Sequence, residues 1–253
     1  MKLIIGNKNY SSWSLRAWLA LRALNQPFEE ERILLDQPGT REQILRFSPS
    51  GRVPCLIDHE SGASPALHGG VSETNVTGAE GAPDSWRRSP KLQLGAIHGP
   101  LTVWDSLAII EYIAERFPQL WPAAAAERAV ARAICAEMHS GFQALRSQMP
   151  MNIRRDLAGR GRSPESEADI ARIVQIWSDC RRRFGHGGPY LFGNFSAADA
   201  MYAPVCFRFQ TYAVEPQAEA GAYLATMLAH PAMQEWAAAA RAETEIVMPD
   251  ELP

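Results

Sequence analysis

The chain has 253 residues, of which 46% are hydrophobic and 21% are charged, and its formal net charge is −3. These fractions are typical of globular proteins and exclude wholesale disorder and fibrous repeats. The slightly negative charge argues against a nucleic-acid partner, because phosphate binding needs a basic face. No run of about 18 apolar residues occurs, so we predict no transmembrane helix and expect no membrane partner.

The cysteines and the N-terminus indicate where the protein works. The four cysteines show neither CxxC nor zinc-ligand spacing, so we expect no disulfide framework and no metal site. They are Cys55, Cys135, Cys180 and Cys206. The N-terminus enters a strand-like run directly and lacks the features of a signal peptide. We therefore expect a reduced, cytoplasmic protein.

Strand-like and helix-like segments alternate in the first half of the chain. Short β-branched or apolar runs predict strands, and apolar residues at helical spacing predict helices. In chain order the predicted elements are strand Lys2–Gly6, helix Ser14–Leu24, strand Phe28–Leu35, helix Arg41–Phe47, strands Val53–Asp58 and Leu101–Trp104, and helix Ser106–Phe117. This β-α-β-α-β-β-α order predicts an α/β layer with a mixed sheet.

A segment of unusual composition separates the last two predicted strands. Residues 61–100 contain 7 Gly and 4 Pro, and Trp86 is their single aromatic residue. Such a segment buries little apolar area, so we predict a loop or disordered insertion.

The second half of the chain contains helix-like segments and no convincing strand. The predicted helices are separated by Gly and Pro clusters, and they are Ala123–Ser147, Pro164–Phe184, Ser196–Tyr212, Ala218–Ala229 and Pro231–Ala242. We predict an all-helical domain here.

Serines stand where the first strand ends and the first helix begins, in the motif Tyr10–Arg16. Main-chain N–H groups at a helix start are unpaired and carry partial positive charge. A hydroxyl there can help to hold an anion such as a thiolate. The alternative is that these serines only cap the helix.

A proline opens the third predicted strand, in the motif Ser48–Leu56. If the Val53–Pro54 bond is cis, the main-chain groups of Val53 turn outward and can pair with an extended peptide. The alternative is an ordinary trans proline after a glycine turn.

Two acid–serine pairs precede helices in the later sequence. Asp105 and Ser106 can bind the ammonium and carboxylate of an amino-acid ligand with help from helix amides, although an N-cap explains Ser106 equally well. Ser196 and Asp199 form a capping box before an apolar helix, for which we predict a structural role.

Taken together, these four motifs resemble those of the cytosolic glutathione transferases, in particular the serine-type, zeta-like and bacterial members. The resemblance covers residues 1–60 and 101–241. It implies a thioredoxin-like domain over residues 1–120, with the insertion at 61–100, and an all-helical domain over residues 122–253.

The resemblance also implies a site. Ser11 corresponds to the serine that holds the glutathione sulfur, with Ser12 as the alternate. Arg52, Val53 and Pro54 correspond to the cis-proline loop that binds the peptide, and Asp105 and Ser106 to the pair that binds its γ-glutamyl end. A looser guess places residues of the range 149–154 in the co-substrate pocket.

The implied function is conjugation of the glutathione thiolate to a small electrophile, by a homodimer that uses glutathione as co-substrate and no metal. Alternatives are a maleylacetoacetate isomerase-like enzyme and a non-catalytic glutathione-fold binding protein. The segment Ala17–Leu21 lacks the basic residue found in zeta isomerases. A disulfide or dehydroascorbate reductase would need a cysteine where Trp13 stands.

Overall fold

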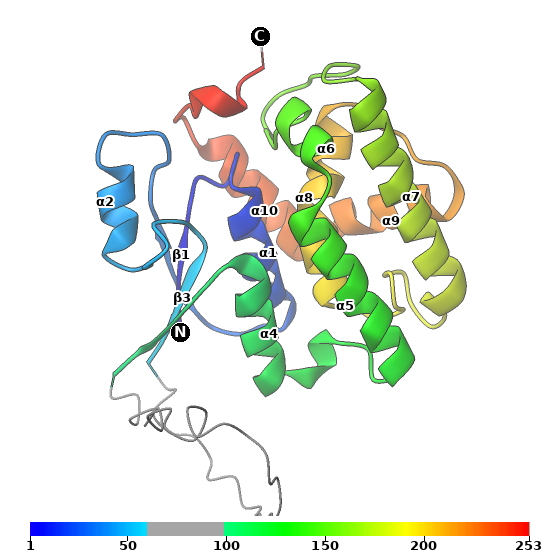
Figure 1. Ribbon diagram of the computed structural model, residues 1–253, viewed down its shortest axis with the longest axis horizontal. Coiled ribbons are helices and arrows are strands. Elements are labelled where there is room, and N and C mark those ends of the chain that lie inside the picture. Colours follow the sequence, from blue (N-terminus) through cyan, green and yellow to red (C-terminus); the bar gives the residue numbers. More distant parts are fainter. Residues whose placement is uncertain (60–98, 253) are drawn as a thin grey trace, which may run out of the picture. The chain divides into compact units, whose positions relative to one another are not determined.

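A computed structural model describes residues 1–59 and 99–252. Met1–Ile57 and Thr102–Pro253 belong to one compact unit, in which a sheet with its helices is followed by a group of further helices (Figure 1). The predicted Gly- and Pro-rich insertion, at 61–100, lies almost entirely outside the described residues.

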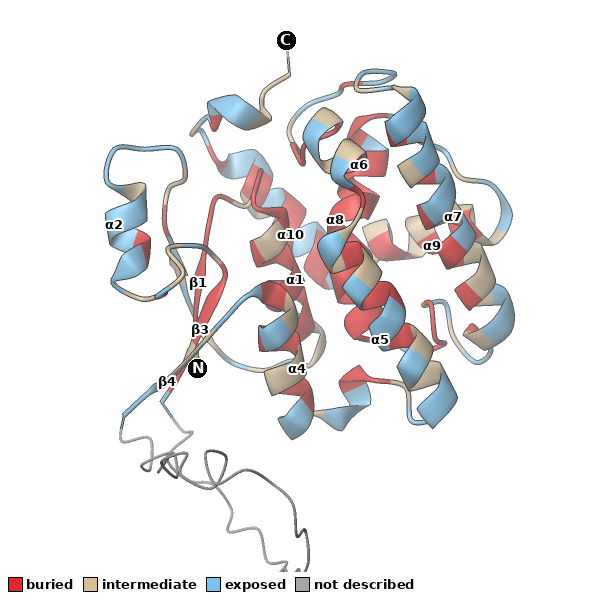
Figure 2. Cartoon of the chain, viewed as in Figure 1, coloured by how far each residue is buried: buried red, intermediate tan, exposed pale blue. Residues whose placement is uncertain are grey.

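The described strands form one mixed sheet with the order β2-β1-β3-β4. They are β1 (Lys2–Ile5), β2 (Glu29–Arg32), β3 (Cys55–Asp58) and β4 (Leu101–Trp104). β1 runs parallel to β2 and antiparallel to β3. Three apolar residues of β1 (Leu3, Ile4 and Ile5) are fully buried (Figure 2), which explains why this strand lies inside the sheet.

β2 is shorter than the predicted strand Phe28–Leu35; its four residues are all charged, and it lies at the edge of the sheet. Lys2 on β1 forms ion pairs with Glu29 (3.0 Å) and Glu31 (2.5 Å) on this strand. Charged side chains on an edge strand also discourage pairing with another chain.

The helices α1 (Ser12–Ala23), α2 (Thr40–Leu45) and α4 (Ser106–Arg116) complete the first half. Figure 1 shows α1 and α4 on one side of the sheet and α2 on the other. The arrangement confirms the predicted thioredoxin-like layer, and α1 begins at Ser12 rather than at the predicted Ser14.

The second half is helical in its described residues, as predicted. Its elements are η1 (Pro118–Leu120), α5 (Ala125–Ser140), α6 (Gln143–Gln148), α7 (Pro164–Phe184), α8 (Ala197–Thr211), α9 (Ala218–Ala229), α10 (Pro231–Ala242) and η2 (Met248–Asp250). None of the described helices is both long enough and apolar enough to cross a membrane.

One predicted helix, Ala123–Ser147, is wrong as a single element, because the chain breaks it into α5 and α6. Gly141 is extended, and Phe142 adopts a left-handed conformation with φ of 60°. A Cβ at Gly141 would lie 2.8 Å from the carbonyl oxygen of Glu137, so a side chain there would clash. The break turns α6 toward the start of α1 (Figure 1), and α6 contributes to the site described below.

Helix α8 is the central helix of the helical half, and nearly all of its residues are buried (Figure 2). The predicted capping box is confirmed at its start. Asp199 accepts hydrogen bonds from the main-chain N–H (2.8 Å) and the hydroxyl (2.8 Å) of Ser196, and from the N–H of Leu191 (3.1 Å). These bonds compensate for burying the carboxylate.

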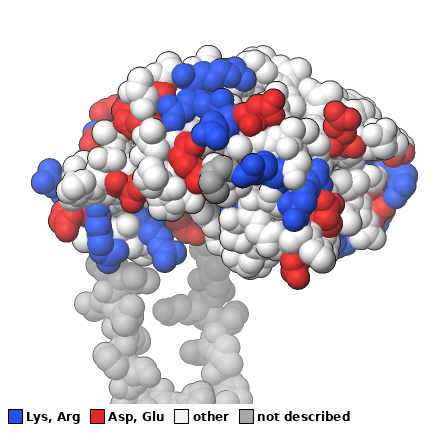
Figure 3. Space-filling model, turned by 90° about the horizontal axis from the view of Figure 1, so that it is seen from above, with Lys and Arg blue, Asp and Glu red and all other residues white. Residues whose placement is uncertain are grey.

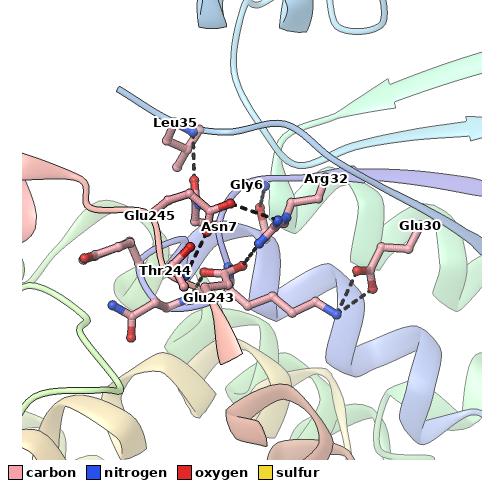
Figure 4. A network of polar contacts seen from close by, with 12 residues as sticks. Gly6, Asn7, Glu30, Arg32, Leu35, Glu243, Thr244 and Glu245 are labelled. Carbon is pink, nitrogen blue, oxygen red and sulfur yellow. Dashed lines mark hydrogen bonds and ion pairs between the residues drawn. The ribbon is translucent and has the colours of Figure 1, made fainter. Parts of the chain in front are cut away.

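A polar network joins the end of α10 to the loop before α1 (Figure 4). The buried carboxylate of Glu243 accepts hydrogen bonds from the main-chain N–H groups of Lys8 (2.7 Å) and Asn9 (3.0 Å), and from Arg32 Nη1 (2.7 Å). Asn7 Oδ1 accepts a hydrogen bond from the N–H of Leu35 (2.8 Å). The loop that leads into α1 is thereby held by elements from both halves of the chain.

Candidate functional site

The start of α1 is organised by three serines. Ser11 is the N-cap, and its Oγ accepts a hydrogen bond from the N–H of Ser14 (3.4 Å). The Ser11 hydroxyl also donates to Ser14 Oγ (2.7 Å), which in addition accepts a hydrogen bond from the N–H of Gly6 (3.0 Å). Ser11 is 6% exposed. Its hydroxyl therefore serves as the helix cap in this conformation.

Ser12 differs from Ser11 in its surroundings. Its hydroxyl makes no hydrogen bond to another described residue, and the same is true of the Trp13 main-chain N–H. Ser12 and Trp13 line a cavity of about 550 Å³ between the start of α1 and the helical half. The first turn of α1 thus offers two unpaired donors beside the cavity, where the positive end of the helix lies.

The proline loop forms another wall of this cavity. The Val53–Pro54 peptide bond is cis, as predicted. Neither main-chain polar group of Val53 is hydrogen-bonded to a described residue. Arg52 is exposed, and its N–H donates to Ser50 Oγ (3.2 Å). Arg52 and Val53 line the same cavity as Ser11 and Ser12.

Asp105 and Ser106 lie at the start of α4. Asp105 is the N-cap, with φ of 74°, and its Oδ1 accepts a hydrogen bond from the N–H of Leu107 (2.8 Å). Its Oδ2 lies 3.3 Å from His139 Nε2. Ser106 Oγ is buried and has no hydrogen-bond partner in the described part of the chain. A buried hydroxyl without a partner is costly, so a ligand group is a natural partner for it.

These residues line a second cavity of about 510 Å³, which also includes Arg52, Val53 and Pro54. The two cavities share Trp13, Arg52 and Val53. The structure therefore brings all seven predicted site residues to two adjoining cavities. Ser11 and Ser12 lie at the first, Pro54, Asp105 and Ser106 lie at the second, and Arg52 and Val53 lie at both.

Trp13 is held at the junction of the cavities by three side chains. The guanidinium carbons of Arg16 and Arg146 lie 4.4 and 4.7 Å from its ring centroid, and the His139 ring meets it edge-on at 5.2 Å. Burial lowers the pKa of His139, and Arg16 and Arg146 lower it further, whereas Asp105 opposes the shift. His139 is therefore mostly neutral at neutral pH.

Several lining residues were not predicted from the sequence. They are Trp13, Gln143, Arg146, Arg208 and Asp250 at the first cavity and His139 at the second. An arginine within the mostly apolar α8 segment is a signal that could have pointed to Arg208. Of the range 149–154, Met151 lines the first cavity, whereas Arg154 donates to the hydroxyl of Tyr10 (2.7 Å).

The cysteines are unsuited to act as nucleophiles. All four are free and buried. Burial raises the pKa of the Cys55 thiol to about 11 and that of Cys180 to about 12, and it raises the pKa values of Cys135 and Cys206 as well. If a thiolate acts in these cavities, a ligand must supply it.

The structure defines a thioredoxin-like layer with a cis-proline loop, followed by a helical domain. Residues 10–78 match the family model described as glutathione S-transferase, N-terminal domain, and residues 163–239 match the one described as glutathione S-transferase, C-terminal domain. Together the two matches cover more than half of the chain, which belongs to the glutathione S-transferase family. No curated protein matches the sequence.

Solved structures share this fold. A glutathione transferase homolog from Burkholderia gl BGR1, with bound glutathione, is 19% identical, with a TM-score of 0.58 over 96% of this chain and 98% of that one. A family member from Pseudomonas fluorescens pf-5, with two glutathione molecules bound, is 17% identical, with a TM-score of 0.57 over 93% and 92%. Glutathione transferase F2 from Populus trichocarpa is 13% identical, with a TM-score of 0.59 over 96% and 99%.

Proposed function

We propose that the protein joins the sulfur of glutathione to small electrophiles. In this reaction the thiol first loses its proton to solvent. The thiolate then attacks an electrophilic carbon, a sulfur–carbon bond forms, and the leaving group departs with the electrons of its broken bond. A free thiol has a pKa near 8.5, so at neutral pH the thiolate must be stabilised by the protein.

The observation that carries this proposal is the pair of unpaired donors at the start of α1. The Ser12 hydroxyl and the Trp13 N–H both belong to residues that line the first cavity. Two such donors at the positive end of a helix lower the pKa of a thiol placed against them. We assign the sulfur contact to Ser12 rather than to Ser11, because the Ser11 hydroxyl already donates to Ser14.

The rest of the tripeptide fits the remaining predicted residues. The free main-chain groups of Val53 suit the cysteinyl backbone, which would bind there as an added strand. The Asp105 carboxylate suits the γ-glutamyl ammonium, and the buried Ser106 hydroxyl suits the neighbouring carboxylate together with the amides of α4. Bound glutathione in two of the similar structures supports this choice of ligand.

The rival is a binding protein without turnover. The unpaired Ser12 donor favours catalysis, because a protein that only binds the peptide has no need to lower the thiol pKa. The test is retention on glutathione resin combined with turnover of an aryl halide. We expect the protein to be retained on the resin and to turn over the aryl halide. Retention without turnover would support the binding protein instead, and absence of retention would refute the proposal.

A further inference from the structure

The helical wall of the first cavity carries positive charge that no acid neutralises at close range. Arg146 lies on α6, Arg208 on α8, and Arg16 behind them on α1. In the described part of the chain, no carboxylate lies within 4 Å of any of the three. The side chains of these arginines hydrogen-bond to main-chain carbonyls: Arg16 Nε to Met201 (3.2 Å), Arg208 Nε to Met149 (2.9 Å) and Arg146 Nε to Gly141 (2.9 Å).

Burying these cations together is unfavourable. Burial and the charge of Arg146 lower the pKa of Arg208 to about 10, and burial lowers that of Arg16 well below its usual range, helped by Arg146 and Arg208. Because arginine side chains keep their protons in proteins, three positive charges are buried close together here. Uncompensated charge in a low-dielectric wall is unfavourable. An anionic ligand that enters the cavity therefore offsets part of this unfavourable free energy.

Arg208 presents the free end of its side chain to this cavity. The residue is 4% exposed and lines the cavity. Its Nη atoms have no hydrogen-bond partner among the described residues. A guanidinium with two free nitrogens matches the two oxygens of a carboxylate.

Asp250 is the acid that faces this wall. It lines the same cavity, and burial raises its pKa to about 6, although the charge of Arg208 opposes the shift. Asp169 also acts on Arg146 and Asp105 on Arg16. Among the described residues none of these carboxylates lies within ion-pair distance of the three arginines, so the wall stays positive. By contrast, basic and acidic side chains lie next to one another on the outer face shown in Figure 3.

We propose that the first cavity selects electrophiles that carry a carboxylate, which Arg208 binds through its free Nη atoms with Arg146 beside it. This inference rests on the proposed function, because it names the class of co-substrate that the glutathione sulfur attacks. Ser12 and Arg208 belong to the same cavity, so a small aromatic acid can place its reactive carbon toward the sulfur and its carboxylate toward α8.

The test uses two electrophiles that differ at one group: a chloronitrobenzoate, which carries a negative charge, and its neutral methyl ester. Each kcat/KM is divided by the rate of the uncatalysed reaction with glutathione, which corrects for intrinsic reactivity. We expect the wild type to prefer the acid by about tenfold or more, since a hydrogen-bonded charge pair stabilises by about 1.5–3 kcal/mol, which converts to that range. Arg208→Gln should abolish the preference, and Arg208→Lys should retain part of it.

Arg182→Gln is the matched control, because Arg182 is exposed on α7 and the substitution makes the same change in net charge. It should leave the acid-to-ester ratio unchanged. The inference is overturned if the wild type shows no preference for the acid, or if Arg208→Gln leaves the ratio unchanged. It is also overturned if Arg208→Gln raises the KM for glutathione while the ratio stays the same, since Arg208 would then bind a carboxylate of the peptide.

Calorimetry on the wild type tests the inference without turnover and without relying on a variant that folds. We expect the S-(carboxybenzyl) conjugate of glutathione to bind about tenfold or more tightly than its methyl ester. Equal affinities would overturn the inference. Tighter binding of the acid, in a protein that conjugates neither electrophile, would support an anion-binding pocket and refute the transferase proposal.

Discussion

Replacing Ser12 by alanine removes one hydroxyl donor from the start of α1 and leaves the main chain of the helix intact. A hydrogen bond to a charged group is worth about 1.5–3 kcal/mol, and about 1.36 kcal/mol corresponds to one pKa unit. Loss of a donor to the thiolate therefore raises the pKa of bound glutathione by about one to two. Because the Trp13 N–H remains, we expect the lower part of this range.

The assay is the pH dependence of thiolate formation, followed by ultraviolet absorbance of the bound sulfur and by kcat. Raising the thiol pKa lowers the thiolate fraction below that pKa, so turnover of Ser12→Ala should fall by about tenfold near pH 6.5. It should recover as the pH rises through the new pKa. The KM for glutathione should change little, because the rest of the peptide contacts persist.

Ser11→Ala is the matched control. It removes the N-cap of α1, so it should lower the free energy of unfolding by about 0.5–2 kcal/mol and leave the thiol pKa nearly unchanged. The reasoning is refuted if Ser12→Ala leaves the thiol pKa as it was. A shift of that pKa in Ser11→Ala alone would return the sulfur contact to Ser11.

Three further predictions follow from the same structure and one from the family. Asp105→Asn keeps a side chain that can cap the helix but loses the negative charge. Glutathione should therefore bind about tenfold more weakly in calorimetry, with kcat little changed. An unchanged affinity would contradict the assignment of Asp105 to the γ-glutamyl ammonium. Glu243→Ala leaves two main-chain N–H donors without their acceptor. It should lower the free energy of unfolding, measured in urea, by about 1–3 kcal/mol. A change near zero would contradict a stabilising role for the network. Because the pKa of Asp250 lies at about 6, this group gains negative charge as the pH rises through 6. The acid-to-ester ratio of kcat/KM should therefore fall over that pH range in the wild type and stay constant in Asp250→Asn. The same pH dependence in both proteins would contradict an effect of Asp250 on the ratio. Sedimentation should give a homodimer, about twice the chain mass of 27.9 kDa, and a monomer mass at micromolar concentration would contradict it.

The order of elements and the local motifs could be predicted from the sequence, because their signals are short-range. The apolar run of β1, the capping box of Ser196 and Asp199, and the proline after Val53 each depend on neighbouring residues. Such signals locate a turn or a helix start without knowledge of the fold. The break between α5 and α6 was missed because a single glycine within an alanine-rich helical pattern does not reveal its backbone conformation.

Which serine has a free hydroxyl was decided only by the tertiary structure. The sequence offers Ser11 and Ser12 side by side, and their roles depend on how the chain turns from β1 into α1. In the fold, Ser14 receives hydrogen bonds from both Gly6 and Ser11, which occupies the Ser11 hydroxyl and leaves that of Ser12 unpaired. A hydroxyl's partner depends on its three-dimensional surroundings, and these are not encoded in the local pattern.

The chemistry of the cavity wall likewise comes from tertiary packing. By itself the sequence determines a thioredoxin-like layer, a helical domain and a set of motifs that resemble a glutathione site. Arg16, Arg146 and Arg208 are spread over nearly 200 positions, and no sequence pattern places the three together. They meet because α8 packs against α1 and because Arg146 on α6 and Arg16 on α1 contact the same Trp13 ring. Burial then makes their charges act on one another. Charge that is screened in water becomes a selective force only where the fold excludes the solvent.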